Sequence, residues 1–266
     1  FVQTLVDDFE LFNSNHQALV IQIISHCQCD EFIMPIVITG IDSTSESVAI
    51  ASLKALAKAT NIKLTLGVIR NIYQLLGFSE TMEEYGLSLE AFYLLKVFSS
   101  RDKRLQNILF DTITEDLATY DDERIKRGLR GLPLVAHMFS DTRETLFNLI
   151  CDSPEKYTID LTSSMYEICL YDRDVIDLFF EFVVEVAKQS DIENTKTALK
   201  YFCKLPHEIY PAHPALEIFA TLAFKETDAM ATDFFFPLGV LLEHIGDLDD
   251  DLIAMQIFEV ALNRFM

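Results

Sequence analysis

The strongest constraint on the fold of this chain is a helical phrase that recurs along it: a polar or acidic start, followed by apolar residues at helical spacing. The clearest copies begin at Glu46, Ser88, Asp141, Arg173, His213 and Asp250. Their successive spacings are 42, 53, 32, 40 and 37 residues. A mean period of about 41 residues is typical of stacked repeats of two or three helices. We therefore expect an all-α fold built from such repeats.

A pair of helices buries only one face by itself, so each repeat must lie against the next. The segment 174–186 illustrates the pattern, since its apolar residues from Val175 to Val184 recur at helical spacing. Asp177, Glu181 and Glu185 stand four residues apart on the opposite side. We interpret these three acids most simply as a solvated face.

Length and composition agree with one large stack of repeats. The 266 residues, 50% of them hydrophobic, can bury a substantial core. We expect a single repeat domain over residues 1–266. The chain opens on Phe1 without an initiator methionine, and its last helical segment lacks a polar capping repeat. A fragment of a longer chain is therefore an open alternative.

Local signals also favour helices. Ser43 followed by Glu46, and Asp141 followed by Glu144, have the spacing of helix N-terminal caps. Residues 33–41 are rich in β-forming residues, yet the proline among them and the repeat pattern suit a short helix at least as well.

The repeated phrase resembles the armadillo/HEAT superfamily of α-solenoids over nearly the whole chain. The resemblance is carried by the capped phrases, above all ESVAIASLKALAKAT at 46–60, whose alanines and leucines look like the inner helix of such a repeat. It implies a right-handed α-solenoid of irregular repeats. The 53-residue and 32-residue intervals depart from regular spacing. The ladder of tryptophan and asparagine found in nuclear-import armadillo adaptors is missing, so a cargo groove of that type is not expected.

The formal net charge of -21 indicates which partners the chain favours. So acidic a surface repels phosphate backbones and anionic lipid, and it speeds encounters with basic proteins. We expect a protein partner with a basic segment, no nucleic acid and no membrane. An alternative of equal weight is that the acidity serves solubility and helix starts alone. The longest apolar stretches are also too short and too often interrupted by charge to span a membrane.

Two charged sets are candidate partner-binding residues. The basic set comprises Arg101, Lys103, Arg104, Arg124, Lys126, Arg127 and Arg130. It could dock an acidic tail or helix, although the simpler interpretation pairs it with the nearby acids Asp121, Asp122 and Glu123. The acidic set comprises Asp247, Asp249, Asp250 and Asp251. It could meet a basic segment of a partner, although a solvated loop is the simpler interpretation.

Signatures of catalysis or of cofactor binding are missing from the sequence. It contains no P-loop, no GxGxxG, no HExxH and no GxSxG. Its six histidines are scattered, and Cys27 and Cys29 form a lone CxC without a second ligand pair. We expect no catalytic residue, no cofactor and no metal site. The five cysteines are most simply reduced core thiols, which indicates an intracellular protein of the cytoplasm or nucleus.

Three functions follow, in order of preference. The first is a non-catalytic scaffold or adaptor that holds a partner protein on the concave face of the solenoid. The second is an assembly chaperone, because the irregular acidic repeats loosely resemble the armadillo/HEAT-type chaperones that bind ATPase subunits of the proteasome regulatory particle. The third is an all-helical enzyme or enzyme regulatory subunit, which would need a deep pocket of converging carboxylates or histidines.

Overall fold

The computed structural model describes residues 2–26, 30–59, 64–77, 86–152, 156–188, 192–202 and 204–205. All regular structure in this part of the chain is helical. The chain divides into two compact units, Phe1–Val135 and Ala136–Met266, which are described separately below. The expectation of a single repeat domain over 1–266 stays a prediction.

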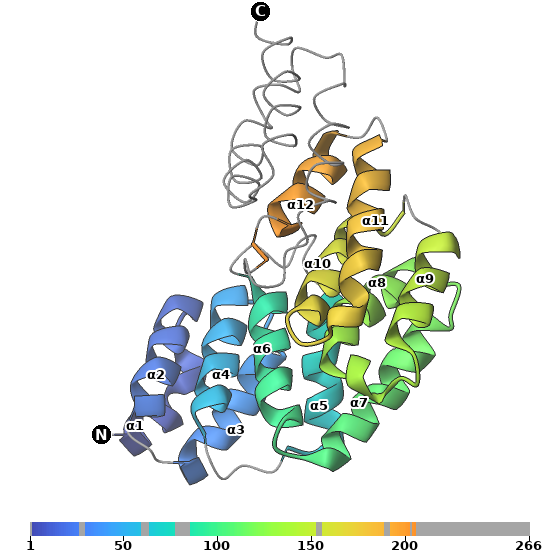
Figure 1. Cartoon of the computed structure of the whole chain (residues 1–266). Helices are drawn as coiled ribbons and strands as arrows, with labels where there is room; N and C mark the ends of the chain where they lie inside the picture. Colours follow the sequence, from blue (N-terminus) through green and yellow to red (C-terminus); the bar gives the residue numbers. More distant parts are fainter. Residues whose placement is uncertain are drawn as a thin grey trace, which may run out of the picture. The chain divides into compact units, whose positions relative to one another are not determined.

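Unit 1 consists of α-helices and short 3-10 helices in tandem (Figure 1). Its elements are α1 (Val2–Asp7), η1 (Phe9–Leu11), α2 (Ser14–His26), α3 (Asp30–Ile41), α4 (Glu46–Lys58), α5 (Leu66–Gln74), η2 (Leu75–Gly77), α6 (Leu87–Ser99), α7 (Lys103–Leu117), α8 (Asp122–Gly131) and η3 (Leu132–Leu134). Helices α2, α4 and α6 lie side by side (Figure 1). Helix α3 packs against α2 and α4, and α5 packs against α6, so these helices form a second layer.

The two layers are held together by apolar side chains that point inward. Leu53 and Leu56 of α4, Phe92 and Leu95 of α6 and Ile72 of α5 are all essentially inaccessible to solvent. Burying one such side chain stabilises the fold by about 1.5–3 kcal/mol, so this core accounts for the pairing of the layers. Exposed side chains remain on the outward faces of these helices, among them Lys54 and Lys58 of α4 and Tyr93 and Lys96 of α6.

Unit 2 contains the remaining described helices. They are η4 (Ala136–Met138), α9 (Thr142–Asp152), α10 (Thr158–Cys169), η5 (Arg173–Val175), α11 (Ile176–Lys188) and α12 (Ile192–Phe202). Helix α10 packs against α11 and α12, and α9 lies against α11. The ring of Phe202 meets Phe180 edge-on at a centroid distance of 4.7 Å and also contacts Phe179 at 6.4 Å. These buried rings fasten α12 to α11.

The structure decides two local predictions about helix starts. Asp141 caps α9 as expected, because its Oδ1 accepts the amide N–H of Glu144 at 2.9 Å. Ser43 does not cap α4, because its Oγ accepts the amide N–H of Ser45 before the helix begins. The prediction at Ser43 was wrong because a spacing motif cannot fix the exact first residue of a helix.

The stretch with β-rich composition is helical. It forms most of α3, with Pro35 inside the helix. The Thr39 hydroxyl donates to the carbonyl of Pro35 at 2.9 Å. The helical alternative is therefore confirmed, since packing against α2 and α4 outweighs the β-rich composition.

Candidate partner-binding groove

The basic set predicted from sequence divides into residues held within the fold and residues exposed on it. Asp116 of α7 is only 1% exposed and lies between two of the arginines. Arg124 donates through Nε to its Oδ1, and Arg127 donates through Nε to its Oδ2, each at 2.8 Å. The Tyr73 hydroxyl donates to the same carboxylate at 3.0 Å. These three donors make Asp116 the anchor of the α7–α8 hairpin.

The protonation of this cluster follows from its contacts. Burial alone would raise the pKa of Asp116, but the hydrogen bonds from Arg127, Arg124 and Tyr73 outweigh burial and hold that pKa below its usual value. Burial and the neighbouring Asp116 raise the pKa of Tyr73, so the phenol stays a donor at neutral pH. Arg127 also donates to Gln74 and lies over the Tyr73 ring at 5.4 Å.

Two further members of the set also have partners in unit 1. Arg130 is 3% exposed, and its Nη1 donates to the carbonyl of Leu76 at 2.8 Å. Lys126 pairs with Glu123 on the surface of α8 at 2.9 Å. Arg124, Arg127 and Arg130 therefore serve the packing of α8.

The exposed members of the basic set lie where α7 begins. Arg101, Lys103 and Arg104 are all exposed, and none makes an ion pair within the described ranges. Their docking role stays a prediction. The predicted acidic set, Asp247, Asp249, Asp250 and Asp251, lies outside the described residues.

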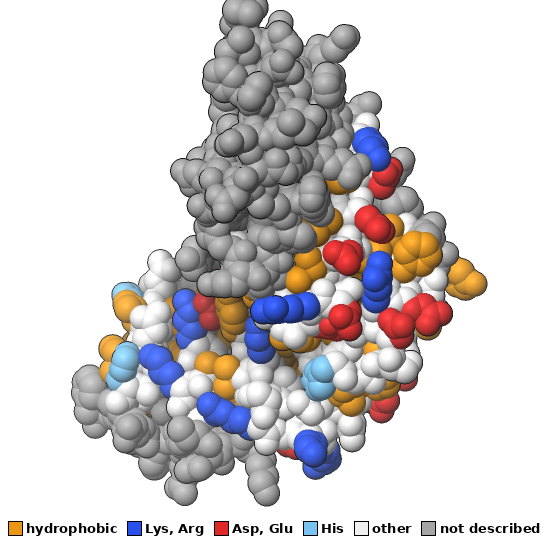
Figure 2. Space-filling model, in the orientation of Figure 1, with side chains coloured by type: hydrophobic (Ala, Val, Ile, Leu, Met, Phe, Trp, Pro, Cys, Tyr) orange, Lys and Arg blue, Asp and Glu red, His pale blue; other side chains and the backbone are white. Residues whose placement is uncertain are grey.

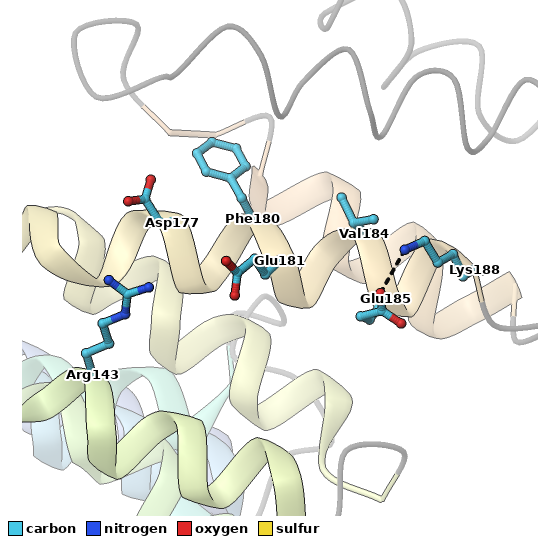
Figure 3. Close-up of a pocket in the computed structure, with 7 residues that line it drawn as sticks. All are labelled: Arg143, Asp177, Phe180, Glu181, Val184, Glu185 and Lys188. Atoms are coloured by element: carbon cyan, nitrogen blue, oxygen red, sulfur yellow. Dashed lines mark hydrogen bonds and ion pairs between the residues drawn. The ribbon is translucent and has the colours of Figure 1, made fainter.

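A surface groove of about 550 Å³ in unit 2 is lined by charged residues that belong to neither candidate set. Arg143 of α9 lines one side of it, and six residues of α11 line the other: Asp177, Phe180, Glu181, Val184, Glu185 and Lys188. Figure 3 shows Asp177, Glu181 and Glu185 in sequence along α11, with Arg143 pointing from α9 toward them. Acidic side chains follow α11 on the molecular surface as well (Figure 2).

The groove combines an apolar base with charged walls. Phe180 and Val184 are nearly buried, so they form its base, whereas Asp177, Glu181 and Glu185 are exposed. Glu185 pairs with Lys188 at 2.8 Å. Asp177 and Glu181 make no ion pair among the residues that the structure describes. Two carboxylates thus remain available to a cationic ligand.

Helix α9 adds an exposed aromatic side chain next to the groove. Phe147 is 51% exposed and comes one helical turn after Arg143. Residues four apart share one face of a helix. A ligand in the groove could therefore meet carboxylates on α11 and an aromatic ring on α9.

The acidic row is visible in the sequence, but the groove that it lines is not. The four-residue spacing of Asp177, Glu181 and Glu185 was visible, and it was interpreted as a solvated face. What turns this row into one wall of a groove is the position of α9, with Arg143 across from it. No local signal in the sequence marks Arg143 as a groove residue.

The described residues contain no group of three or more His, Cys, Asp or Glu side chains placed to hold a metal ion. Burial, with a smaller effect of Asp172, raises the pKa of Cys169 to about 12, so this thiol is not a nucleophile near neutral pH. In the part of the chain that the structure describes, no helix is both long and apolar enough to cross a membrane.

The likeness of this chain to known proteins lies in its fold. No protein-family model matches it, and no curated protein matches its sequence. A solved structure of Kap95p with RanGDP, concerned with nuclear import complex assembly, matches at a TM-score of 0.62 and 11% identity, over 99% of this chain and 41% of that one. The Kap95:Nup1 complex matches at a TM-score of 0.58 and 11% identity, over 88% of this chain and 32% of that one.

These likenesses confirm the fold predicted from the repeats. The chain is an all-α, right-handed α-solenoid of the armadillo/HEAT type with irregular repeats. It spans less than half the length of either matched chain. As a class, it is a helical-repeat fold.

Proposed function

We propose that this protein is a non-catalytic scaffold that holds a basic segment of a partner protein in the groove between α9 and α11. The observation that carries the proposal is the acidic row on α11, in which Asp177 and Glu181 face the groove without an ion pair among the described residues. Lysine or arginine side chains of a bound segment would supply the missing counter-charges. Phe147 would contact the apolar side chains of the same segment.

The fold supports a binding role. Helical repeats expose extended surfaces, and their most common use is to bind other proteins. Kap95p, which shares this fold, occurs in solved structures with RanGDP and with Nup1. The same class of role, in the cytoplasm or nucleus, suits a chain in which Cys169 is a buried free thiol.

Charge supports the choice of a basic ligand. The net charge of -21 attracts cationic segments from a distance, and the groove concentrates carboxylates at one place on the surface. Attraction between exposed charges weakens beyond about 8 Å at physiological salt, so binding should fall steeply as salt rises.

The test is a fluorescence anisotropy titration of the full chain with a short labelled peptide of alternating lysine and leucine. The substitution pair Asp177→Lys and Glu181→Lys places two positive charges on the groove wall. We expect this pair to weaken binding by about tenfold or more, because like charges then face the peptide. The wild-type affinity should also fall as salt is added.

The matched control is the pair Asp111→Lys and Glu115→Lys on α7. These acids are also exposed and four residues apart, but they do not line the groove. We expect the control to change the affinity less than about twofold, through net charge alone. An equal loss of affinity in the two double variants would show that peptide binding depends only on net charge. That result would overturn the groove as the binding site.

A further inference from the structure

A second exposed surface, on α4 and α6 of unit 1, carries the opposite charge. The outward stripe of α4 presents Lys54 and Lys58, and the outward stripe of α6 presents Tyr93 and Lys96. Lys54 pairs with Glu90 of α6 at 3.1 Å, which shows that the two stripes lie side by side on one face. We call these five residues the α4/α6 face.

The α4/α6 face is basic on a chain that is otherwise acidic. It holds three lysines and one glutamate, while the whole chain has 21 basic and 42 acidic residues. Figure 2 shows basic side chains among hydrophobic ones over α4 and α6. Such a local reversal of sign favours an anionic ligand at this face and repels a cationic one.

The face also offers apolar contact area. Tyr93 is 49% exposed and stands edge-on to the buried ring of Phe92 at a centroid distance of 5.9 Å, which fixes its position. Lys96 lies over the Phe92 ring at 5.6 Å. Helix α2, which packs against α4, leaves Leu19 and Ile23 about half exposed one turn apart. A tyrosine held in place beside lysines is a typical anchor of a protein interface.

We propose that the α4/α6 face docks an acidic segment of a partner protein, one that alternates carboxylates with apolar side chains. Charge complementarity selects this occupant: its carboxylates would meet Lys58 and Lys96, and its apolar side chains would cover Tyr93. The proposal goes beyond the groove in unit 2, because the two surfaces select segments of opposite charge.

An anionic nucleic acid is disfavoured as the occupant. Each phosphate of a duplex would approach a chain of net charge -21, whereas a short acidic segment brings few charges and adds apolar contact. A DNA duplex should therefore bind more weakly than an acidic peptide.

The test uses the full chain and a labelled peptide of alternating glutamate and leucine, titrated by fluorescence anisotropy. The pair Lys58→Glu and Lys96→Glu should weaken binding about tenfold, because two attractive contacts become repulsive. Tyr93→Ala should weaken it about fivefold through lost apolar contact, with little change in the dependence on salt. Thermal unfolding of each variant confirms that the fold is intact.

The control pair is Arg70→Glu on α5 and Arg173→Glu on η5, two exposed arginines outside the α4/α6 face, which makes the same change in net charge. We expect this pair to leave the affinity nearly unchanged. If the control variant loses as much affinity for the peptide as the Lys58/Lys96 variant, or more, the proposal that the α4/α6 face binds it is overturned. It is also overturned if a labelled DNA duplex binds more tightly than the peptide and loses affinity in the Lys58/Lys96 variant.

The lysine–leucine peptide separates this proposal from the scaffold proposal. The Lys58/Lys96 variant should bind that peptide as well as the wild-type chain does, or slightly better. If only the acidic peptide fails to bind, the proposal for the α4/α6 face is overturned. If only the basic peptide fails to bind, the proposal for the groove is overturned.

Discussion

The α7–α8 hairpin of unit 1 and the α11–α12 pair of unit 2 are fastened in different ways. The first is joined through the buried carboxylate of Asp116, which accepts hydrogen bonds from two arginines and a tyrosine. The second is joined through the rings of Phe180 and Phe202, which meet edge-on. In unit 1 the charges of α7 and α8 are used inside the fold, whereas in unit 2 aromatic rings join α11 to α12 and the charges of α11 lie outside.

This difference shows why counting charges along the sequence is a poor guide to a binding site. Three of the seven predicted basic residues, Arg124, Arg127 and Arg130, are engaged with Asp116 or with a backbone carbonyl. The acids of α11 have no such role in packing. A charge is available to a partner only where the fold does not already need it.

The largest expected effect comes from removing a ring in unit 2. Phe202→Ala leaves a cavity against Phe179 and Phe180, and should lower the free energy of local opening by about 4 kcal/mol. Hydrogen exchange followed by mass spectrometry should show faster exchange in α11 and α12 and unchanged exchange in α7 and α8. Phe147→Ala, which removes a half-exposed ring, is the control and should cost less than about 1 kcal/mol.

The next effect comes from removing the carboxylate of unit 1. Asp116→Ala leaves Arg124, Arg127 and the Tyr73 hydroxyl without their shared acceptor, and should cost about 3 kcal/mol. The same exchange measurement should report the loss in α7 and α8, with α11 and α12 unaffected. The control is Asp111→Ala on the exposed side of α7, and a loss of similar size there would contradict the special role of Asp116.

The smallest effect is a difference in response to acid. The pKa of Asp116 is lowered in the folded chain, so its ionised form stabilises unit 1. This contribution is complete above the pKa of an unfolded aspartate, about 3.9, and is lost as the pH falls through the lower folded value.

The measurement is exchange in α7 and α8 of the wild-type chain and of Asp116→Asn, which cannot ionise, over a range of acidic pH. Each rate is first corrected for the intrinsic effect of pH on exchange. The stability advantage of the wild-type chain should shrink as the pH falls below about 4. An advantage that stays constant with pH would show that the charge of Asp116 does not contribute.

The repeat pattern predicted these helices well because each helix buries one side, so that apolar residues recur at helical spacing along the sequence. The phrases that begin at Glu46, Ser88, Asp141 and Arg173 coincide with α4, α6, α9 and the η5–α11 segment. The remaining two phrases, at His213 and Asp250, lie outside the described residues. Local periodicity suffices here, since each helix needs an apolar face whatever its neighbour is.

The sites were predicted less well because they depend on contacts between helices. The arginines of α8 were expected to pair with Asp121, Asp122 or Glu123, which are close in sequence. Asp121 instead caps α8, and Asp116 of the preceding helix accepts both arginines. That pairing is set by how α7 packs on α8, which the spacing of residues along one helix does not specify.

Cys169, at the end of α10, makes the interior of unit 2 accessible to a chemical measurement. Its side chain is fully buried and its thiol is held in the protonated form, so an alkylating reagent can reach a reactive thiolate only when this helix opens. Peptide mapping distinguishes this sulfur from the other cysteines by its position in the sequence. The rate at which Cys169 becomes alkylated then reports how often this part of unit 2 opens, and the measurement needs no substitution in the chain.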